Sequence, residues 1–526
     1  MSYQPDERYV SPIIGDLNLP PDDRTSGTPA ADEPVAVLVE LNVLYPGGLA
    51  EVTRAFFEEI WGRYSAWAQA ESPVGDTAAS VLQPPVPAGL RRVTPKLYQC
   101  VLTRRQIRDM VHWDQARANP DGQPPPAIFK VWPDYTLRPL IDRSAPTVKA
   151  DAAWRSYNAR GRGIVWAVVD SGIEACHPHF SALELAAEVG AGSGSPPKRT
   201  ADLHRDFSHF VELPGSPPPG KPQPLVDDSG HGTHVAGIIA GQTPTGKTPH
   251  VALSQEPPAG GGYVPRDRVS VLSGMAPECE LVSLKVLRRD GQGNWVTSSA
   301  AVIAALNYLR TEVNVDPGVL RVHGVNISLG SPWDPTHYAA GQSPLCQAVN
   351  QLVDSGVVVV VSAGNSGAGQ SSDFANATAV LGSITEPAHA ENCIAVGSTH
   401  REAPHAFGVT WTSSKGPTLD GRMKPDVVAP GEWITSAAAG ALRRRAHLDE
   451  LTDPDRLLTY AEQSGTSMAA PHVSGVIAAF LSARPEFIGR PREVKRVLVQ
   501  SATDLGRERY AQGAGLVDLM RMLSNV

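Results

Sequence analysis

The sequence predicts an α/β protein: a mostly parallel central sheet with helices on both faces, preceded by a small α+β domain. Two observations lead to this fold class. From Gly163 onward, short and continuous aliphatic runs alternate with helical segments, which is typical of buried parallel strands joined by helices. Before that point, strand-like and helix-like segments follow one another in the order βαββαβ, the order of a small ferredoxin-like domain.

The small domain is predicted over residues 34–140, after a flexible N-terminal arm of residues 1–33 that is polar and rich in Pro and Asp. Apolar residues alternate over 34–43, which predicts a strand, and recur at three-to-four spacing over 48–64, which predicts a helix. The remaining elements are a strand pair around 91–102, a helix with Thr103 as its N-cap, and a strand at 127–132.

The larger domain is predicted over residues 141–526. Its clearest strands are residues 164–169, 281–286 and 357–361, and its clearest helices are residues 298–309 and 467–483. Three stretches rich in Gly, Pro or charge are predicted to be loop-rich insertions, because each is longer than an ordinary connection; they are residues 190–225, 242–268 and 438–462.

The composition excludes several classes of partner. The 46 basic and 54 acidic residues among 526 give a net charge of −8, which provides no broad basic face for nucleic acid. The longest apolar run, residues 300–306, is far shorter than the about 20 residues of a membrane-spanning helix. We therefore expect neither a nucleic-acid partner nor a membrane.

The N-terminal sequence and the cysteines favour a cytoplasmic location. Residues 1–23 contain acidic residues and prolines and have no apolar stretch of signal length, so they do not resemble a secretory signal. The five cysteines include no CxxC pair, and an odd number fits reduced thiols better than a disulfide framework or a zinc site.

Three reactive side chains stand where apolar elements begin or end. Asp170 ends a buried strand, at the edge where open α/β sheets bind ligands. His231 lies between glycines at the start of an apolar helix, and Ser467 lies at the start of another. A serine hydroxyl becomes a nucleophile when a base takes its proton, and the base needs a carboxylate to hold its tautomer. The three residues supply that set.

The motifs around these residues resemble those of the subtilisin-like serine proteases. Residues 170–172, 231–234 and 465–471 match the family's D-S/T-G, H-G-T-H and G-T-S-M-A-x-P, in the family's order along the chain. The resemblance covers about residues 140–526. It implies a serine endopeptidase that hydrolyses protein or peptide substrates through an acyl-enzyme on Ser467. The alternative is a non-catalytic peptide-binding scaffold of the same fold.

The resemblance also implies an oxyanion hole and a substrate cleft. Asn365 matches the asparagine whose side chain donates to the oxyanion, and the backbone N–H of Ser467 would be the second donor. Thr385 would be the floor of the P1 pocket, and the loop around it holds no acidic residue placed to demand a basic P1 side chain, so we expect an apolar or neutral one. The walls of the cleft would be Ser328, Leu329 and Gly330 on one side and Ser362, Ala363 and Gly364 on the other.

In this family a βαββαβ domain before the protease is usually a propeptide that inhibits the enzyme. Residues 131–140 resemble a propeptide end, which implies a junction after Leu140, with Leu140 in the P1 pocket and Leu137 at P4. The N-terminal domain would then be an intramolecular inhibitor that keeps the enzyme a zymogen. The alternative is a docking domain that stays attached.

No cofactor is predicted. His179 stands where many relatives carry an aspartate that ligates a structural calcium, and calcium prefers hard oxygen ligands, which puts that site in doubt. His234 and His472 also lie in the motifs and are predicted to pack in the interior. The H-G-T-H spacing lacks the glutamate of the H-E-x-x-H zinc motif.

Overall fold

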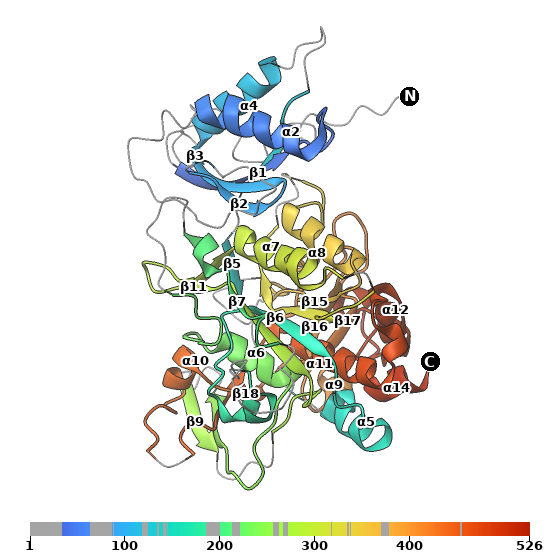
Figure 1. Cartoon of the computed structure of the whole chain (residues 1–526). Helices are drawn as coiled ribbons and strands as arrows, with labels where there is room; N and C mark the ends of the chain where they lie inside the picture. The colour runs from blue at the N-terminus through green and yellow to red at the C-terminus, as the bar shows by residue number, and fades with distance from the viewer. Residues whose placement is uncertain are drawn as a thin grey trace.

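The computed structural model describes residues 34–63, 87, 89–117, 125–133, 136–139, 144, 146–185, 200–212, 221–255, 262–266, 272–316, 318–333, 336, 338–369, 378–452 and 455–525. The predicted arm, residues 1–33, and the predicted junction residue Leu140 lie outside the described residues. Within them, a small antiparallel sheet near the N-terminus stands above a larger domain built on a parallel sheet (Figure 1). The predicted fold class is therefore confirmed.

The small domain has the predicted ferredoxin-like topology. Its elements are β1 (Pro34–Leu41), α2 (Gly48–Ala55) continued by η2 (Phe56–Trp61), β2 (Arg91–Thr94), β3 (Leu97–Thr103), α4 (Arg104–Arg117) and β4 (Ile128–Pro133). The strands pair in the order β2-β3-β1-β4 and run antiparallel. The predicted N-cap is confirmed, because Thr103 Oγ1 accepts the N–H of Gln106 at 3.1 Å while Gln106 Oε1 accepts the N–H of Thr103 at 2.8 Å.

The sheet of the small domain has two buried faces. Val37 and Val39 pack in the domain's own core, whereas Leu38, between them, packs in a core that includes residues of the large domain. Trp132 of β4 belongs to this shared core, and its ring meets that of Tyr338 edge to face with 5.8 Å between centroids. The small domain is therefore docked through the sheet face that its own helices leave open.

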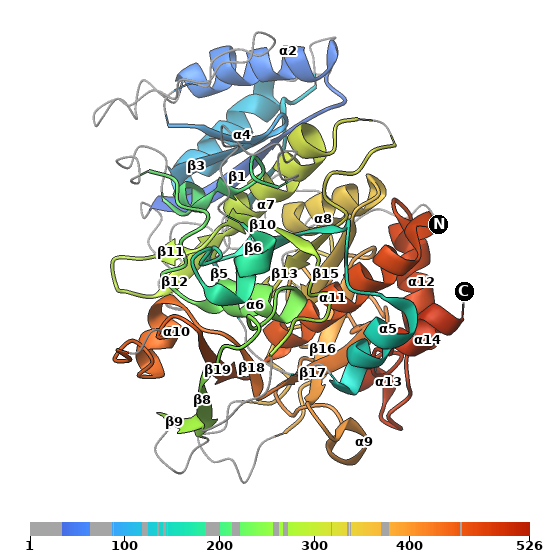
Figure 2. The ribbon, with the colours of Figure 1, turned by 60° about the horizontal axis from the view of Figure 1, so that its bottom comes forward.

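The docking face meets α7 (Ser299–Tyr308) and η5 (Ser208–Val211) of the large domain. Figures 1 and 2 agree in placing α7 next to the small sheet. Gln99 donates through Nε2 to the carbonyl oxygen of Phe210 at 2.7 Å, and Arg91 donates to that of His209 at 2.6 Å. The Arg91 guanidinium also lies 5.1 Å from the centre of the Phe210 ring. Side chains of the small domain thus bond to backbone carbonyls of the large one.

The large domain is built on a seven-stranded parallel sheet of the described residues, in the order β17-β16-β15-β13-β6-β10-β7. Its strands are β6 (Val165–Asp170), β7 (Arg205–Asp206), β10 (Glu280–Lys285), β13 (Gly324–Ile327), β15 (Val358–Ser362), β16 (Ile394–His400) and β17 (Val427–Glu432). Two helices on one face, α6 (His231–Ile239) and α11 (Thr466–Ala483), oppose α7 and α8 (Pro344–Asp354) on the other (Figures 1 and 2).

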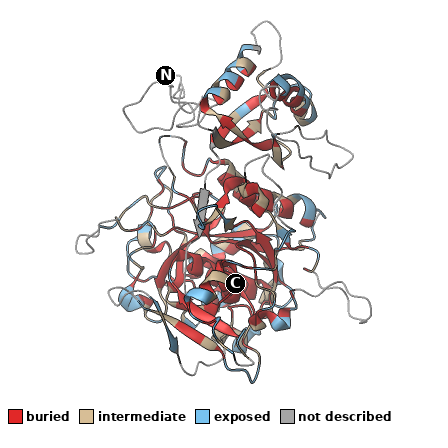
Figure 3. Ribbon diagram, turned by 90° about the vertical axis from the view of Figure 1, so that its left-hand side faces the viewer, coloured by how far each residue is buried: buried red, intermediate tan, exposed pale blue. Residues whose placement is uncertain are grey.

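Alternation along the strands divides the interior into two cores. In β6, Trp166 and Val168 pack with α6 and α11, whereas Val165, Ala167 and Val169 pack with α7 and α8. Because both faces are covered, every residue of β6 is buried, which is why the strand reads as a continuous apolar run. Buried residues accordingly gather along the central sheet and the helices against it (Figure 3).

Helix α11 is the one helix among the described residues that is long and apolar enough to cross a membrane, but 89% of it is buried in the protein interior. It contacts α6 and the strands β13, β15, β16 and β17. Its apolar composition is that of a core helix of the sheet domain.

Two of the predicted loop-rich insertions form a sheet together, which corrects the prediction. The sheet has the order β18-β19-β8-β9 and consists of β8 (His250–Gln255), β9 (Gly262–Arg266), β18 (Ile434–Ala437) and β19 (Thr459–Gln463), near the short helix α10 (Gly440–Arg445). Thr459 lies opposite His250 in a parallel pair. The sequence did not reveal this pairing because the two strands are about 200 residues apart and neither shows a clear period.

The remaining described elements are short or peripheral. They are β5 (Thr136–Pro139), η3 (Pro146–Val148), α5 (Ala150–Tyr157), η4 (Pro178–Leu183), β11 (Arg288–Arg289), β12 (Trp295–Ser298), η6 (Leu309–Val313), β14 (Leu329–Gly330), α9 (Pro404–Phe407), η8 (Pro485–Phe487), α12 (Pro491–Ser501), α13 (Arg509–Gln512) and α14 (Leu519–Ser524). All five cysteines are free thiols in this structure.

Candidate active site

Asp170 stands at the carboxyl end of β6, in the middle of the sheet. Its side chain is fully buried, and its Oδ1 lies 2.7 Å from Nδ1 of His231. The same oxygen accepts the backbone N–H of Ser171 at 2.8 Å. A carboxylate held in this way keeps the proton of a neutral imidazole on Nδ1, which leaves Nε2 as the basic nitrogen.

His231 is the first residue of α6, and two glycines allow the helix to start there. Gly230, just before it, has a φ of 89°, a left-handed conformation that favours glycine. A Cβ on Gly232 would lie 2.2 Å from the carbonyl oxygen of Gly172, so the helix start can approach the end of β6 only without a side chain. Gly230, before the H-G-T-H motif, and Gly232, inside it, therefore bring the imidazole to Asp170.

A second carboxylate, Asp227, organises the same region and was missed in the sequence. It is buried, and its Oδ2 accepts both the N–H and the hydroxyl of Thr233, at 2.8 and 2.6 Å. Its Oδ1 accepts the Ser171 hydroxyl at 2.8 Å and the N–H of Gly230 at 2.8 Å. Burial raises the pKa of Asp227, and these hydrogen bonds oppose the rise.

Asp227 thus joins the residue after Asp170 to the start of the helix that carries His231. The available sequence signal was its position four residues before His231, at the end of a loop-like stretch. A lone aspartate there is far more often a simple cap, so its role needed the three-dimensional structure.

Ser467 is the second residue of α11 and is fully buried. Its hydroxyl donates to the carbonyl oxygen of Ser328 at 3.0 Å, and the Ser328 hydroxyl donates to the carbonyl oxygen of Ser467 at 2.7 Å. Pro471 explains the second bond. It has no N–H, so the carbonyl four residues earlier, that of Ser467, loses its helical donor, and Ser328 replaces it.

The Ser328 hydroxyl is itself held by a buried polar chain. Asn326 donates through Nδ2 to Ser328 Oγ at 2.9 Å, and Ser474 donates to Asn326 Oδ1 at 2.9 Å. Pro471 is the sixth residue of α11, inside the helix, and the carbonyl that it frees is satisfied by Ser328, the residue directly after β13.

Asn365 lies just after β15, beside the start of α11. Its Oδ1 accepts the N–H of Thr466 at 3.0 Å and the Thr466 hydroxyl at 3.1 Å. Because the side-chain oxygen is occupied in this way, the amide group is fixed in orientation and its NH₂ is left to donate elsewhere. The backbone N–H groups in the first turn of α11, which have no acceptor within the helix, lie next to this amide.

The predicted cleft walls and floor meet at Thr385. A Cβ on Gly330 would lie 2.6 Å from Thr385 Oγ1, and one on Gly364 would lie 2.7 Å from the same atom. Thr385 Oγ1 also lies 3.3 Å from the carbonyl oxygen of Ala363. Thr385 thus fills the space between the two predicted walls, of which Ser328, Leu329, Ser362 and Ala363 are buried.

Next to Thr385, Glu386 is buried and accepts the Tyr338 hydroxyl at 3.3 Å. Burial raises the pKa of Glu386 to about 7, against the opposing effect of hydrogen bonds from Ser343, Cys346 and Tyr338. Glu386 lies near the first turn of α8. The ring of its partner Tyr338 packs against Trp132 of the small domain.

The segment after the small domain runs through the cleft as a strand. β5 lies between β12 and β14, with Thr136 opposite Ser298 and Leu137 opposite Thr297 on one side. On the other side Arg138 pairs with Gly330 and Pro139 pairs with Leu329. All pairs are antiparallel. The chain itself thus pairs with Leu329 and Gly330, one of the predicted walls of the substrate cleft.

His179, His234 and His472, the three other histidines considered from the sequence, are buried. His179 lies 3.0 Å from the Tyr460 hydroxyl and 3.1 Å from the carbonyl oxygen of Ala240, and burial lowers its pKa to about 4. Burial also lowers the pKa of His234 to about 3 and that of His472 to about 4. No group of three His, Cys, Asp or Glu side chains that could hold a metal occurs in the part of the chain that the structure describes.

Comparison with known proteins identifies the sequence family. The Subtilase family model matches residues 161–516. The chain is 29% identical to Serine protease AprX of Bacillus subtilis (strain 168) over 399 residues, which cover 74% of this chain and 73% of that protein. It is 32% identical to M-protease of Shouchella clausii (strain KSM-K16) over 300 residues, covering 57% of this chain and 56% of that protein. Identity to Subtilisin Savinase of Lederbergia lenta is also 32% over 300 residues, covering 79% of that protein.

Proposed function

The chain belongs to the subtilase family and is a subtilisin-like serine endopeptidase, and from this premise we propose that Ser467 is its nucleophile, His231 its general base and Asp170 the carboxylate that orients the base. The observation that supports the proposal most strongly is the buried contact of 2.7 Å between His231 Nδ1 and Asp170 Oδ1. With Nδ1 engaged, Nε2 is the nitrogen that can receive a proton.

The reaction begins with rotation of the Ser467 side chain away from the Ser328 carbonyl and toward His231. Ser467 Oγ then attacks the scissile carbonyl carbon while Nε2 takes the hydroxyl proton. When the tetrahedral species collapses, the C–N bond breaks and the imidazolium gives its proton to the leaving amine. Water, activated by the same imidazole, attacks the acyl-enzyme and releases the second product. Asp170 stabilises the imidazolium in both steps.

The developing oxyanion is stabilised by two donors, the Asn365 side-chain NH₂ and the backbone N–H of Ser467. The contact of Asn365 Oδ1 with Thr466 supports this role, since it fixes the amide beside the helix start that holds Ser467 and leaves the NH₂ group available to donate. Donors fixed in advance need no reorganisation during the reaction, which is why such a pair is effective.

We further propose that residues 34–140 inhibit the enzyme until they are removed. Two observations support this. β5 occupies the cleft as the middle strand between β12 and β14, and Ser467, His231 and Asp170 are almost fully buried in the whole chain, at 0, 3 and 0% exposure. A product-like strand in this place excludes a substrate, because both bind by adding a strand to the same edges. Cleavage would follow Leu140.

The substrate would be an extended segment of a protein or peptide that replaces β5. Thr385 between Gly330 and Gly364 shortens the P1 pocket, which favours an uncharged P1 side chain of moderate size. The cytoplasmic location stays a prediction.

Intact-mass spectrometry of the purified chain tests self-processing. We expect the wild-type chain to lose residues 1–140 and the Ser467→Ala chain to remain whole. Ser464→Ala is the matched control, because Ser464 is an exposed serine three residues earlier, and it should be processed like the wild type. If wild type and Ser467→Ala give the same full-length mass, self-cleavage at Leu140 is wrong.

A further inference from the structure

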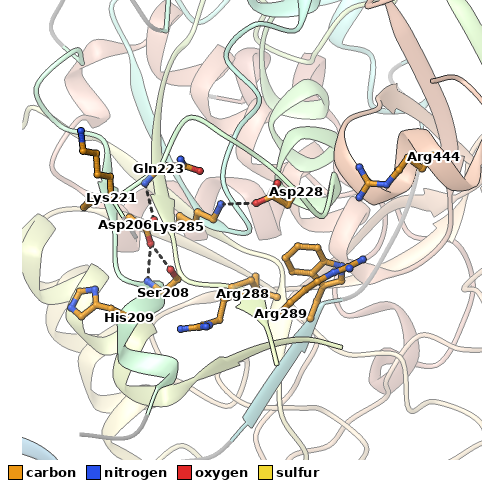
Figure 4. A pocket seen from close by; sticks show the side chains of 13 residues that line it. Asp206, Ser208, His209, Lys221, Gln223, Asp228, Lys285, Arg288, Arg289 and Arg444 are labelled. Atoms are coloured by element: carbon orange, nitrogen blue, oxygen red, sulfur yellow. Dashed lines mark hydrogen bonds and ion pairs between the residues drawn. The ribbon is translucent and has the colours of Figure 1, made fainter. Parts of the chain in front are cut away.

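A pocket of about 490 Å³ opens beside the catalytic residues, and its lining is strongly cationic (Figure 4). Five cationic side chains line it, against two carboxylates, in a chain whose net charge is −8. The cationic residues are Lys221, Lys285, Arg288, Arg289 and Arg444. They come from separate parts of the chain, including β10, β11 and α10, so the positive charge arises from the fold and not from one basic run.

The two carboxylates leave much of this charge uncompensated. Asp206 already accepts three hydrogen bonds: the N–H and hydroxyl of Ser208 at 2.9 and 2.6 Å and the N–H of Gln223 at 2.9 Å. Asp228 lies 3.8 Å from Lys285 Nζ, which also donates to the Val226 carbonyl at 2.8 Å. Both carboxylates are therefore already engaged, as the dashed contacts in Figure 4 show.

Three of the cations have no carboxylate partner among the described residues. Arg288 is paired with Glu212. In contrast, Arg289 lies over the ring of Trp295, 5.1 Å from its centre, and stacking leaves its in-plane N–H groups able to donate. Lys221 and Arg444 are exposed and form no ion pair with a described residue. The pocket thus presents donors to an anion.

The position of the pocket relates it to the substrate path. Lys285 lies beside Asp170 in the register of β10 and β6, and Asp228 comes three residues before His231. Farther along, Trp295 pairs with Arg289 across β12 and β11. Leu137 of β5 lies opposite Thr297 of β12 in an antiparallel pair. Continuing this register by two residues would place position 139 opposite Trp295.

Position 139 is the second residue before the proposed scissile bond, the P2 position. Directly opposed residues of neighbouring strands share a face of the sheet, so in the continued register a residue at position 139 of an extended substrate would share a face with Trp295 and its partner Arg289. A substrate strand that replaces β5 would direct its P2 side chain along this row, toward the cationic pocket.

We propose that this pocket recognises an acidic side chain at P2 of the substrate; the proposal rests on the endopeptidase function and cleft proposed above. A carboxylate at P2 would accept hydrogen bonds from Arg289 and gain from the charges of Arg444 and Lys221. The pocket makes the protease selective for segments with Asp or Glu one residue before P1, while Thr385 sets the size of P1.

The test compares peptides that differ only at P2. Fluorogenic peptides with Leu at P1 and Asp, Asn or Lys at P2 are hydrolysed by the processed enzyme, and kcat/KM is measured for each. We expect Asp to exceed its isostere Asn by about fivefold, and Lys to fall below Asn. The Asp advantage should shrink when salt is raised to about 0.5 M, since pairs near a surface are screened.

Variants of the pocket locate the effect. In the double variant Arg289→Ala/Arg444→Ala the Asp advantage should fall to less than about twofold, and Arg444→Glu should shift the preference toward Lys at P2. The matched control is Arg445→Ala, an exposed arginine next to Arg444 that does not line the pocket, and it should keep the wild-type preference.

The outcomes separate the proposal from the endopeptidase function. If the Asn peptide is cleaved and the Asp peptide gains nothing at P2, the pocket proposal is overturned while the endopeptidase stands. An equal Asp advantage in the double variant would also overturn it, as would inhibition by inorganic phosphate without any Asp preference, which would make the pocket a site for a free anion. If no peptide is cleaved by processed enzyme, the function itself fails.

Discussion

The interior around the proposed catalytic residues and the docked N-terminal domain are held by different kinds of contact. In the interior, Asp170 meets His231 at 2.7 Å and Asp227 accepts five hydrogen bonds, all of them away from solvent. At the docking face, Arg91 and Gln99 reach across to backbone carbonyls, and among the described residues β5 pairs two residues with each neighbour.

This difference has a functional consequence. Breaking one member of a buried, charge-bearing network leaves its partners unpaired away from water, which is costly. When the N-terminal domain leaves, the donors of Arg91 and Gln99 and the carbonyls that they contact become exposed and can bond to water instead, and two paired residues form a short strand that is readily replaced. The interior is therefore expected to persist when the N-terminal domain leaves.

The largest expected effect is in the interior. Asp170→Asn should lower kcat by about 10⁴-fold with little change in KM, because the carboxamide favours the wrong imidazole tautomer. Steady-state kinetics on a neutral peptide measure it. Asp202→Asn, at an exposed aspartate that pairs with Arg321, should behave as wild type. If Asp170→Asn keeps more than about a tenth of kcat, the interior does not act as described.

The next effect concerns the oxyanion donor. Asn365→Ala should lower kcat by about 10²- to 10³-fold at nearly constant KM. Thr466→Val removes only the hydroxyl that helps to hold Asn365 Oδ1 and keeps the backbone bond at 3.0 Å, so its loss should be smaller, about threefold. An equal loss in both variants would indicate that Asn365 acts by supporting the helix start and not as a donor.

At the docking face the expected change is a gain of activity. Arg91→Ala removes the donor to the His209 carbonyl and the stacking on Phe210, so the full-length chain should start to hydrolyse peptide several-fold faster than wild type. Arg105→Ala, an exposed arginine on α4 of the same domain, is the control and should change nothing. Unchanged initial rates in Arg91→Ala would argue that the domain does not restrain the enzyme.

The smallest expected effect concerns Glu386, which connects the two regions. Glu386 accepts the Tyr338 hydroxyl, and the Tyr338 ring contacts the ring of Trp132 in the N-terminal domain. Since burial raises the pKa of Glu386 to about 7, the native state holds a proton that the unfolded state releases above about 4.5. Stability should therefore fall as pH rises between these values. Glu386→Gln keeps the contact without titrating, so its Tm should match wild type near pH 4.5 and exceed it by about 5 °C near pH 8.

Calorimetry at several pH values measures this difference. Glu493→Gln, a half-exposed glutamate on α12, is the control, and its Tm should follow wild type at every pH. A difference between Glu386→Gln and wild type that is the same at all pH values would show that Glu386 does not titrate in this range.

The sequence predicted the parts of the fold and site that depend on local patterns. The buried strand before Asp170, the helix starts at His231 and Ser467, and the cap at Thr103 each have a period or a motif within a few residues. These patterns are local, so one sequence was enough to place them. Continuous apolar runs indicate strands that are buried on both faces, so a core on each side of the sheet could also be predicted.

What the sequence could not show depends on distant partners. The pairing of β8 with β19, the five hydrogen bonds of Asp227, and the bond from Ser328 to the Ser467 carbonyl all join residues whose proximity only the fold creates. The rotamer of Ser467 is likewise set by the Ser328 carbonyl, which no motif indicates. The cationic pocket was missed for the same reason, since its charges are scattered along the chain.

The most direct test of the central claim is labelling with a fluorophosphonate probe, located by peptide mass spectrometry, before and after the N-terminal domain is released. The account predicts slow labelling of the whole chain, rapid labelling of the released enzyme, and attachment to Ser467 in both. Released enzyme that does not react at Ser467, or whole chain that reacts as fast as released enzyme, would contradict it.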